Sequence, residues 1–187
     1  MAQTVAIIGA GPLGRWLALA SARAGFRVLL EDVMPANLHH AEELVRQQLG
    51  PEALGPVTGP GVVFVSTIED AVREADLAID CVPDELESKL EILWLLDRMA
   101  PPRTVLATPT TRLSIADLAN CTYRPDKVIA IAAEAKALTG SAAEGRGILL
   151  RKTERTAPET LALVEGFWRS LGFEVALELD TLEPQLR

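Results

Sequence analysis

The chain has 187 residues, 49% of them hydrophobic and 24% charged, a composition that predicts a folded domain and excludes a disordered chain. Its 18 basic and 26 acidic residues give a net charge of −8, so we expect no nucleic acid partner, because phosphate backbones are repelled. No apolar run approaches the roughly 20 residues that span a bilayer, so we expect no membrane contact.

The two cysteines, Cys81 and Cys121, lie far apart and show no metal-ligand spacing, which is typical of a reducing compartment. The N-terminal Met-Ala-Gln-Thr has no basic stretch and leads straight into an apolar segment. We therefore expect no signal peptide and a cytoplasmic protein. Cys81 falls inside a predicted strand, where we expect a buried, inert thiol.

Short apolar segments rich in β-branched residues alternate with segments of helical periodicity. This alternation predicts a mainly parallel sheet covered on both faces, a doubly wound α/β fold. The predicted strands are 5–8, 28–30, 62–65, 77–82, 105–107, 128–131, 148–150 and 173–177. The predicted helices are 12–24, 35–49, 69–74, 84–99, 114–119 and 158–171, and the Gly/Pro-rich segment 50–61 is expected to be a surface loop.

The first strand leads into Gly9-Ala10-Gly11-Pro12-Leu13-Gly14, a G-x-G-x-x-G motif that opens a helix. Gly9 permits a tight turn, Gly11 lets a pyrophosphate approach the backbone, and Gly14 lets helix and strand pack closely. The helix start at Pro12 and Leu13 offers its unpaired N–H groups to the phosphates. The motif predicts a dinucleotide site, and the alternative is a glycine-rich turn without a ligand.

The second strand ends in Glu31-Asp32, about twenty residues after the glycines, where a carboxylate holds a ribose 2′-hydroxyl. We interpret Asp32 as that ligand, with Glu31 as the alternative. No arginine follows closely to receive a 2′-phosphate, so the pattern favours NAD over NADP.

Several stretches resemble the NAD-binding domain of the 3-hydroxyacyl-CoA dehydrogenases. Residues 80–89, Asp-Cys-Val-Pro-Asp-Glu-Leu-Glu-Ser-Lys, are similar to the family's E-A-V-P-E-x-L-x-x-K. Residues 107–115, Ala-Thr-Pro-Thr-Thr-Arg-Leu-Ser-Ile, are similar to S-N-T-S-S-L-S-I, and residues 124–129, Arg-Pro-Asp-Lys-Val-Ile, to R-P-E-R-V-I. Residues 6–20 also look like this family.

The resemblance implies a single Rossmann-type domain over 1–187, with a mainly parallel core at 1–131 and an added strand-helix-strand at 145–180. It implies an oxidoreductase of fatty acid metabolism with NAD as cofactor and an acyl-CoA substrate. Thr111 falls on the catalytic serine, which holds the substrate oxygen near the nicotinamide. Asp84 and Lys89 fall on cofactor-contacting positions.

The chain departs from the family at the catalytic base. The family's L-H-F-F-N-P motif is matched by residues 131–136, so Ala132 replaces the histidine and Ala135 the asparagine. Leu149 replaces the glutamate that orients the histidine, and Glu144 lies nearby but outside that strand. A base of this kind needs an imidazole with a carboxylate beside it, and the pair is missing.

Three further departures concern the substrate and the cofactor. The family's helical excursion that contacts CoA is shortened here to segment 50–61, and the helical C-terminal domain is expected to be absent. Trp16 stands where the family has a small residue and is expected to crowd the cofactor. His39 and His40 are expected to be solvated helix residues, with no metal site.

Other functions are therefore open. One is a dehydrogenase or reductase of another small substrate, using Thr111 with Lys136 or Glu134. Another is a binding or regulatory module without catalysis. The structural alternatives are a solvated Lys89, a solvated Lys136, and a Thr111 that only caps or turns the segment before Ser114. Ser114 and Asp117 resemble a capping box.

Helix 84–99 carries apolar residues on more than one face. Ile92 is expected to face inward, together with Leu86, Leu93 and Leu96. The remaining apolar positions, Leu90, Trp94 and Leu95, then face elsewhere, and Trp168 in the last helix replaces a small polar residue. This pattern predicts a homodimer with helix 84–99 in its interface. The alternative is packing under segment 50–61 or the C-terminal tail.

Overall fold

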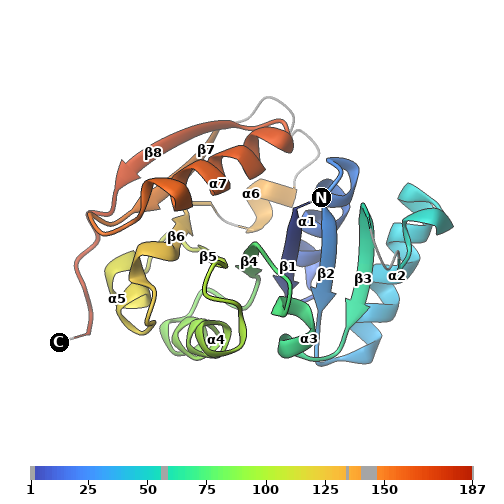
Figure 1. Cartoon of the computed structure of the whole chain (residues 1–187), viewed down its shortest axis with the longest axis horizontal. Helices are drawn as coiled ribbons and strands as arrows, with labels where there is room; N and C mark the ends of the chain where they lie inside the picture. Colours follow the sequence, from blue (N-terminus) through green and yellow to red (C-terminus); the bar gives the residue numbers. More distant parts are fainter. Residues whose placement is uncertain (1–2, 56–58, 134, 140–146, 187) are drawn as a thin grey trace. The chain divides into compact units, whose positions relative to one another are not determined.

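A computed structural model of the chain describes residues 3–55, 59–133, 135–139 and 147–186 (Figure 1). Every predicted strand and helix is present, with its ends within two residues of the expected positions. The chain divides into two compact units, one made of residues 1–81 and 99–104, the other of residues 82–98 and 105–187. Among the described residues, no helix is long and apolar enough to cross a membrane.

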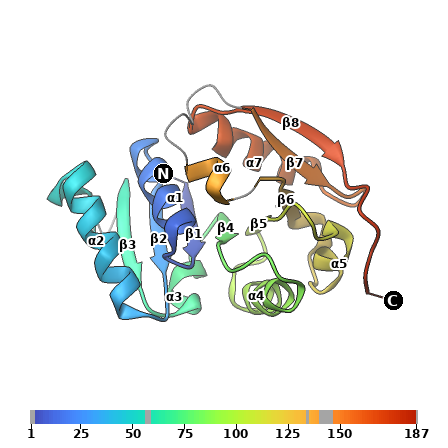
Figure 2. The ribbon, with the colours of Figure 1, turned by 180° about the vertical axis from the view of Figure 1, so that it is seen from behind.

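The first unit is built around four parallel strands in the order β3-β2-β1-β4. Its elements are β1 (Thr4–Ile8), α1 (Pro12–Arg23), β2 (Arg27–Glu31), α2 (Pro35–Leu49), β3 (Gly61–Val65), α3 (Ile68–Val72) and β4 (Leu77–Asp80). The strands are almost entirely apolar and buried because helices cover both faces. Seen from behind, α1 and α2 lie in front of the strands (Figure 2), and a right-handed crossover places α3 on the opposite face.

The order of these strands decides where the glycine-rich loop lies. The chain leaves β1, forms α1 and returns as β2 beside β1, with Ile8 opposite Glu31. It then crosses from β3 to β4 on the other side of β1, with Ile8 also opposite Asp80. The carboxyl end of β1 is thus the point at which the strand order reverses, which is where ligands bind in folds of this class.

The second unit contains four strands in the order β5-β6-β7-β8. The pairs β5–β6 and β7–β8 are parallel and the pair β6–β7 is antiparallel. Its elements are α4 (Leu86–Met99), β5 (Val105–Pro109), α5 (Ile115–Asn120), β6 (Val128–Ile131), α6 (Ala135–Thr139), β7 (Gly147–Lys152), α7 (Pro158–Ser170) and β8 (Glu174–Leu179). The mainly parallel, Rossmann-type α/β class is confirmed. The predicted division of the chain at residue 131 stays a prediction.

The apolar face of α4 is only partly as expected. Ile92, Leu93 and Leu96 are buried, whereas Leu86 is half-buried. Trp94 is 47% exposed and lies under the Arg98 guanidinium, 4.8 Å from its ring centre. Trp168 does not add to an exposed apolar surface, as the dimer prediction assumed. Its ring is completely buried and makes edge contacts with Phe167 and Phe173.

Two smaller expectations are also corrected. Cys81 does not lie inside a strand, because β4 ends at Asp80, and the cysteine is half-buried. Segment 50–61, expected to be a loop, begins with a short 3₁₀ helix, η1 (Pro51–Ala53), and its residues 56–58 lie outside the described part of the chain.

Candidate functional site

The glycine-rich loop (residues 9–14) joins β1 to α1, and its glycines meet different surroundings. Gly9 has a φ of +100°, a conformation that favours glycine. A Cβ on Gly14 would lie 1.8 Å from the Gly9 carbonyl oxygen, so only glycine lets α1 start this close to β1. A Cβ on Gly11 would meet nothing within 4 Å. The space beside Gly11 is therefore open.

The start of α1 carries no side chain that neutralises it. Gly11 is the N-cap, Pro12 is the first helical residue, and no acidic residue occurs in the first turn. Within the described part of the chain, no side chain caps the first N–H groups of the helix. Uncapped N–H groups and the helix dipole make this end of α1 attractive to an anion.

Asp32 lies directly beside the glycine-rich loop. One of its carboxylate oxygens, Oδ2, accepts the Ala10 N–H at 2.8 Å and the Asn37 side-chain amide at 3.0 Å. The other, Oδ1, accepts the Met34 N–H at 2.8 Å. A carboxylate has about four acceptor positions, so one remains for a further donor such as a ribose hydroxyl.

Glu31 is not equivalent to its neighbour. Its backbone carbonyl accepts the Gly9 N–H at 2.8 Å, but its side chain is only 3% exposed and its Oε1 has no hydrogen-bond partner. Burial, followed by the negative charge of Asp32, raises the pKa of Glu31 to about 7. Asp32, and not Glu31, is thus the carboxylate that contacts the loop.

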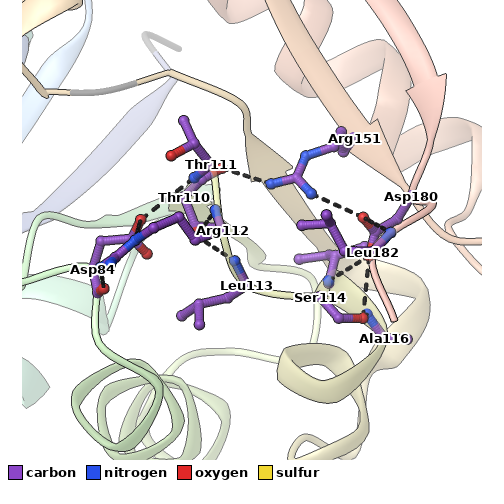
Figure 3. Close-up of polar contacts among 11 residues, drawn as sticks. Asp84, Thr110, Thr111, Arg112, Leu113, Ser114, Ala116, Arg151, Asp180 and Leu182 are labelled. Atoms are coloured by element: carbon purple, nitrogen blue, oxygen red, sulfur yellow. Dashed lines mark hydrogen bonds and ion pairs between the residues drawn. The ribbon is translucent and has the colours of Figure 1, made fainter. Parts of the chain in front are cut away.

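In the second unit, Thr111 lies in the β5–α5 loop (residues 110–114) next to Asp84 (Figure 3). The Thr111 N–H donates to Asp84 Oδ2 at 3.4 Å, and Arg112 donates to the Asp84 backbone carbonyl. The Thr111 side chain is exposed, and no described residue forms a hydrogen bond with its hydroxyl. Its hydroxyl is available to a ligand.

The turn and the helix cap, the alternative roles considered for Thr111, are formed by Thr110 and Ser114. The buried Thr110 hydroxyl accepts the N–H groups of Arg112 and Leu113, at 3.3 and 3.1 Å, and so forms the turn. Ser114 caps α5 by accepting the Ala116 N–H at 3.2 Å. The expected capping box is incomplete, because Asp117 accepts the N–H of Gln185, at 2.6 Å, from the C-terminal tail.

A buried ion pair supports this loop, and the sequence pattern did not predict it. Arg151 donates to the Thr110 carbonyl at 2.7 Å and to Asp180 at 2.9 Å (Figure 3). Asp180 also accepts the Ser114 hydroxyl at 3.2 Å and the Ile115 N–H at 2.7 Å. No local pattern reveals the ion pair, since Arg151 and Asp180 lie 29 residues apart.

A shallow pocket of about 500 Å³ lies next to the β5–α5 loop. It is lined by residues of the second unit, namely Asp84, Glu85, Leu86, Glu87, Arg112, Leu113 and Gln185. The pocket therefore places the Asp84 end of α4 within reach of a small molecule.

The comparisons with known proteins identify the family. The family model for the 3-hydroxyacyl-CoA dehydrogenase NAD-binding domain matches residues 4–132. The chain belongs to the 3-hydroxyacyl-CoA dehydrogenase family. The matched model describes an NAD-binding domain, so the predicted oxidoreductase family and the NAD cofactor are confirmed at this level.

Relatives within the 3-hydroxyacyl-CoA dehydrogenase family differ in their named activities. A probable 3-hydroxybutyryl-CoA dehydrogenase of Bacillus subtilis is 33% identical over 135 residues, which is 68% of this chain and 47% of the relative. The 5-formyl-3-hydroxy-2-methylpyridine 4-carboxylate 5-dehydrogenase of Mesorhizobium japonicum is 29% identical over 185 residues, 92% of this chain and 56% of the relative. The chain spans about half the length of these curated relatives.

Solved structures of the same kinds of enzyme share the fold of this chain. The crystal structure of an Archaeoglobus fulgidus 3-hydroxyacyl-CoA dehydrogenase is 26% identical and matches with a TM-score of 0.78, covering 96% of this chain and 57% of that one. The structure of the 5-formyl-3-hydroxy-2-methylpyridine 4-carboxylic acid 5-dehydrogenase, described as an NAD⁺-dependent dismutase, also has a TM-score of 0.78, with 28% identity.

The positions that resemble the family's base and its partner lie side by side in the second unit. The Ala132 N–H, just after β6, donates to the Leu149 carbonyl of β7 at 2.8 Å, and both residues are half-buried. Lys136 is exposed. Glu134 and Glu144 lie outside the described residues.

The other polar residues that the sequence analysis singled out are either buried or exposed. Lys89 is fully buried, so its expected solvated alternative is wrong, while its cofactor contact stays a prediction. His39 and His40 are exposed on α2, and His39 lies 3.5 Å from Glu43. Within the described ranges no three potential ligands gather to hold a metal ion. Burial raises the pKa of the Cys121 thiol to about 11.

Proposed function

We propose that the chain binds NAD(H) through the glycine-rich loop, with the pyrophosphate over the start of α1 and the adenosine ribose on Asp32. The single observation that carries this is the Asp32 carboxylate, which holds the Ala10 N–H and keeps a free acceptor position beside the open space at Gly11. The proposed loop contacts are Gly9, Gly11, Pro12, Leu13 and Gly14.

NAD, when bound, supplies hydride acceptor and donor chemistry. The chain's own contribution would be to bind the substrate oxygen through the exposed Thr111 hydroxyl. Asp84 accepts the Thr111 backbone N–H and also lines the pocket at α4. The resemblance also assigns Asp84 and Lys89 to the cofactor.

We further propose that this chain does not oxidise 3-hydroxyacyl-CoA at an enzymatic rate by itself. The positions that resemble the histidine and glutamate of the family hold Ala132 and Leu149, and their backbones are hydrogen-bonded to each other. Neither side chain accepts a proton. The loss of a general base typically lowers a rate by about 10²–10⁴.

A second candidate function is the oxidation or reduction of another small substrate that does not need this base. The exposed Thr111 hydroxyl and the altered base positions favour it, with Lys136 or Glu134 as the proposed proton carrier. We also propose a role in fatty acid metabolism, in which an acyl-CoA or another small molecule is bound beside NAD(H), and a cytoplasmic location. Neither Cys81 nor Cys121 forms a disulfide in the described structure, in keeping with a reducing compartment.

Calorimetric titration of the whole chain with NAD⁺ and NADH tests the cofactor proposal. We expect wild type to bind and Asp32→Asn to bind about 10- to 100-fold more weakly, as for the loss of a charge-assisted hydrogen bond. No heat and no rise in Tm at millimolar cofactor would instead support a module without cofactor. Trp16→Gly then tests whether the indole blocks the site.

Turnover of 3-hydroxybutyryl-CoA separates the two enzymatic proposals. We expect the pure chain to produce NADH at or near the background rate. The proposed loss of activity would be refuted if wild type turned over this substrate at an enzymatic rate. Thr111→Val should then remove that rate, and Ala132→His should not raise it.

We also propose that the chain forms a homodimer through α4, because Trp94 stays 47% exposed on this helix. Light scattering on wild type and Trp94→Glu tests this. The control is Met34→Glu, at an apolar residue that is 56% exposed and lies just before α2. We expect only Trp94→Glu to halve the mass. A monomeric wild type at tens of micromolar would refute it.

A further inference from the structure

We propose that Arg15, on the first turn of α1, contacts the cofactor pyrophosphate and completes the anion site of the glycine-rich loop. This inference rests on the proposed cofactor site and adds to it a side chain that the motif does not include. It concerns only residues of the first unit.

The position of Arg15 directs its side chain at the loop. Its backbone N–H donates to the Gly11 carbonyl at 3.0 Å, which places the residue one turn into the helix. Helical side chains lean towards the N-terminus, and here the guanidinium Nη1 reaches the Ala10 carbonyl at 2.7 Å. The Ala10–Gly11 region is thus held from two sides, by Asp32 at the Ala10 N–H and by Arg15 at the Ala10 carbonyl.

The hydrogen bonds of Arg15 are incomplete. A guanidinium has five N–H donors, and the Ala10 carbonyl is the one acceptor that the described residues offer to Arg15. The side chain is half-buried and forms no ion pair with any described carboxylate. Its remaining donors are free for an anion at the loop.

The other arginines of the first unit behave differently. This unit contains no lysine, and each of its five other arginines bonds to a side chain. The pairs are Arg23 with Gln48, Arg27 with Glu74, Arg46 with Glu42, Arg73 with Asp70 and Arg103 with Asp76. Arg15 is therefore the arginine of this unit whose partner is a backbone atom of the glycine-rich loop.

The charge around the loop gives this cation a function. A pyrophosphate diester carries two negative charges, and the Asp32 carboxylate lies beside the loop in a chain of net charge −8. The start of α1 offers only partial charges and backbone donors. A full positive charge at the loop offsets the repulsion and adds hydrogen bonds of the stronger, charge-assisted kind.

The test compares Arg15→Gln and Arg15→Lys with Arg23→Gln. Arg23 lies on the same helix and loses the same charge, but it sits at the opposite end, bonded to Gln48. The probes are ADP, which has the pyrophosphate, and adenosine, which lacks it. Affinities are measured by displacement of NADH fluorescence at low and at physiological ionic strength.

We expect Arg15→Gln to weaken ADP about 10- to 100-fold, the size of a lost hydrogen bond to a charged group. Adenosine affinity should be little changed, Arg15→Lys should recover part of the loss, and the salt dependence of ADP binding should diminish in Arg15→Gln. Arg23→Gln should resemble wild type throughout.

Two results would overturn the inference about Arg15 alone. One is ADP binding by Arg15→Gln as tight as by Arg23→Gln. The other is an equal loss of adenosine and ADP, which would mean that Arg15 only shapes the loop. If wild type binds neither NAD nor ADP, the proposed cofactor site itself is refuted, and the role of Arg15 falls with it.

Discussion

Two glycines of the glycine-rich loop should differ in how an added methyl group changes the stability of the fold. In Gly14→Ala the Cβ would lie 1.8 Å from the Gly9 carbonyl oxygen, whereas close C···O contacts are about 3.3–3.6 Å. Because the obstacle is backbone, α1 or the loop must shift by about 1.5 Å. Overpacking typically costs about 1–3 kcal/mol, and we expect the upper end.

In Gly11→Ala nothing within 4 Å opposes the methyl group, and the φ of −68° suits alanine. The reduced freedom of the unfolded chain stabilises the fold by about 0.4–1 kcal/mol. The poorer N-cap offsets part of that gain. The stability should therefore stay nearly unchanged, while the methyl group enters the space proposed for the pyrophosphate. We expect at least about a tenfold loss of NAD affinity, or about 1.4 kcal/mol.

Thermal unfolding and NAD titration of both variants check these expectations. Each kcal/mol corresponds to about 2–4 °C in Tm for a chain of this size. Gly14→Ala should lose both Tm and affinity, and Gly11→Ala only affinity. If Gly11→Ala binds NAD as tightly as wild type, the pyrophosphate does not lie at this loop. If Gly14→Ala keeps its Tm, the packing argument is wrong.

Two further expectations concern buried charges. The pKa of Glu31 rises from 4.5 to about 7 on folding, so the protonated form is favoured in the folded chain. The contribution of Glu31 to the free energy of unfolding should therefore be greatest below pH 4.5 and be lost between pH 4.5 and about 7, by on the order of 3 kcal/mol. In urea unfolding, this part of the pH dependence should be missing from Glu31→Gln. Asp180→Asn leaves the buried Arg151 without its charged partner and should cost about 3–5 kcal/mol in denaturant unfolding. The control is Arg112→Met, which removes an exposed ion pair at a side chain that is 70% exposed and should change stability by less than about 0.5 kcal/mol. If Asp180→Asn and Arg112→Met cost the same, burial does not decide the cost of losing an ion pair.

The sequence was sufficient to predict most strands and helices and the contact between Asp32 and the glycine-rich loop. Parallel strands buried on both faces are continuous apolar runs, and α2 begins and ends at Pro35 and Leu49 as expected. The G-x-G-x-x-G motif and Asp32 lie close together because β1 and β2 are adjacent parallel strands, whose carboxyl ends meet at one edge. Local pattern and strand pairing agree there, so the prediction needed no distant contact.

The errors occurred where distant residues decide the outcome. The pairing of Arg151 with Asp180 joins residues brought together only by β7 and β8. Trp168 looks like a surface residue along α7, yet Phe173, the residue just before β8, helps to bury it. The Asp117 carboxylate accepts the Gln185 N–H of the C-terminal tail instead of an N–H at the start of its own helix. The two residues lie 68 positions apart, so the local helix pattern does not indicate this bond.

A crystal structure of the chain with NAD tests the central claim most directly. We expect the pyrophosphate within hydrogen-bond distance of the N–H groups of Leu13 and Gly14, and the adenosine ribose hydroxyls on the Asp32 carboxylate. Cofactor density placed elsewhere in the chain, or a clear apo structure at saturating NAD in an open lattice, would contradict the account.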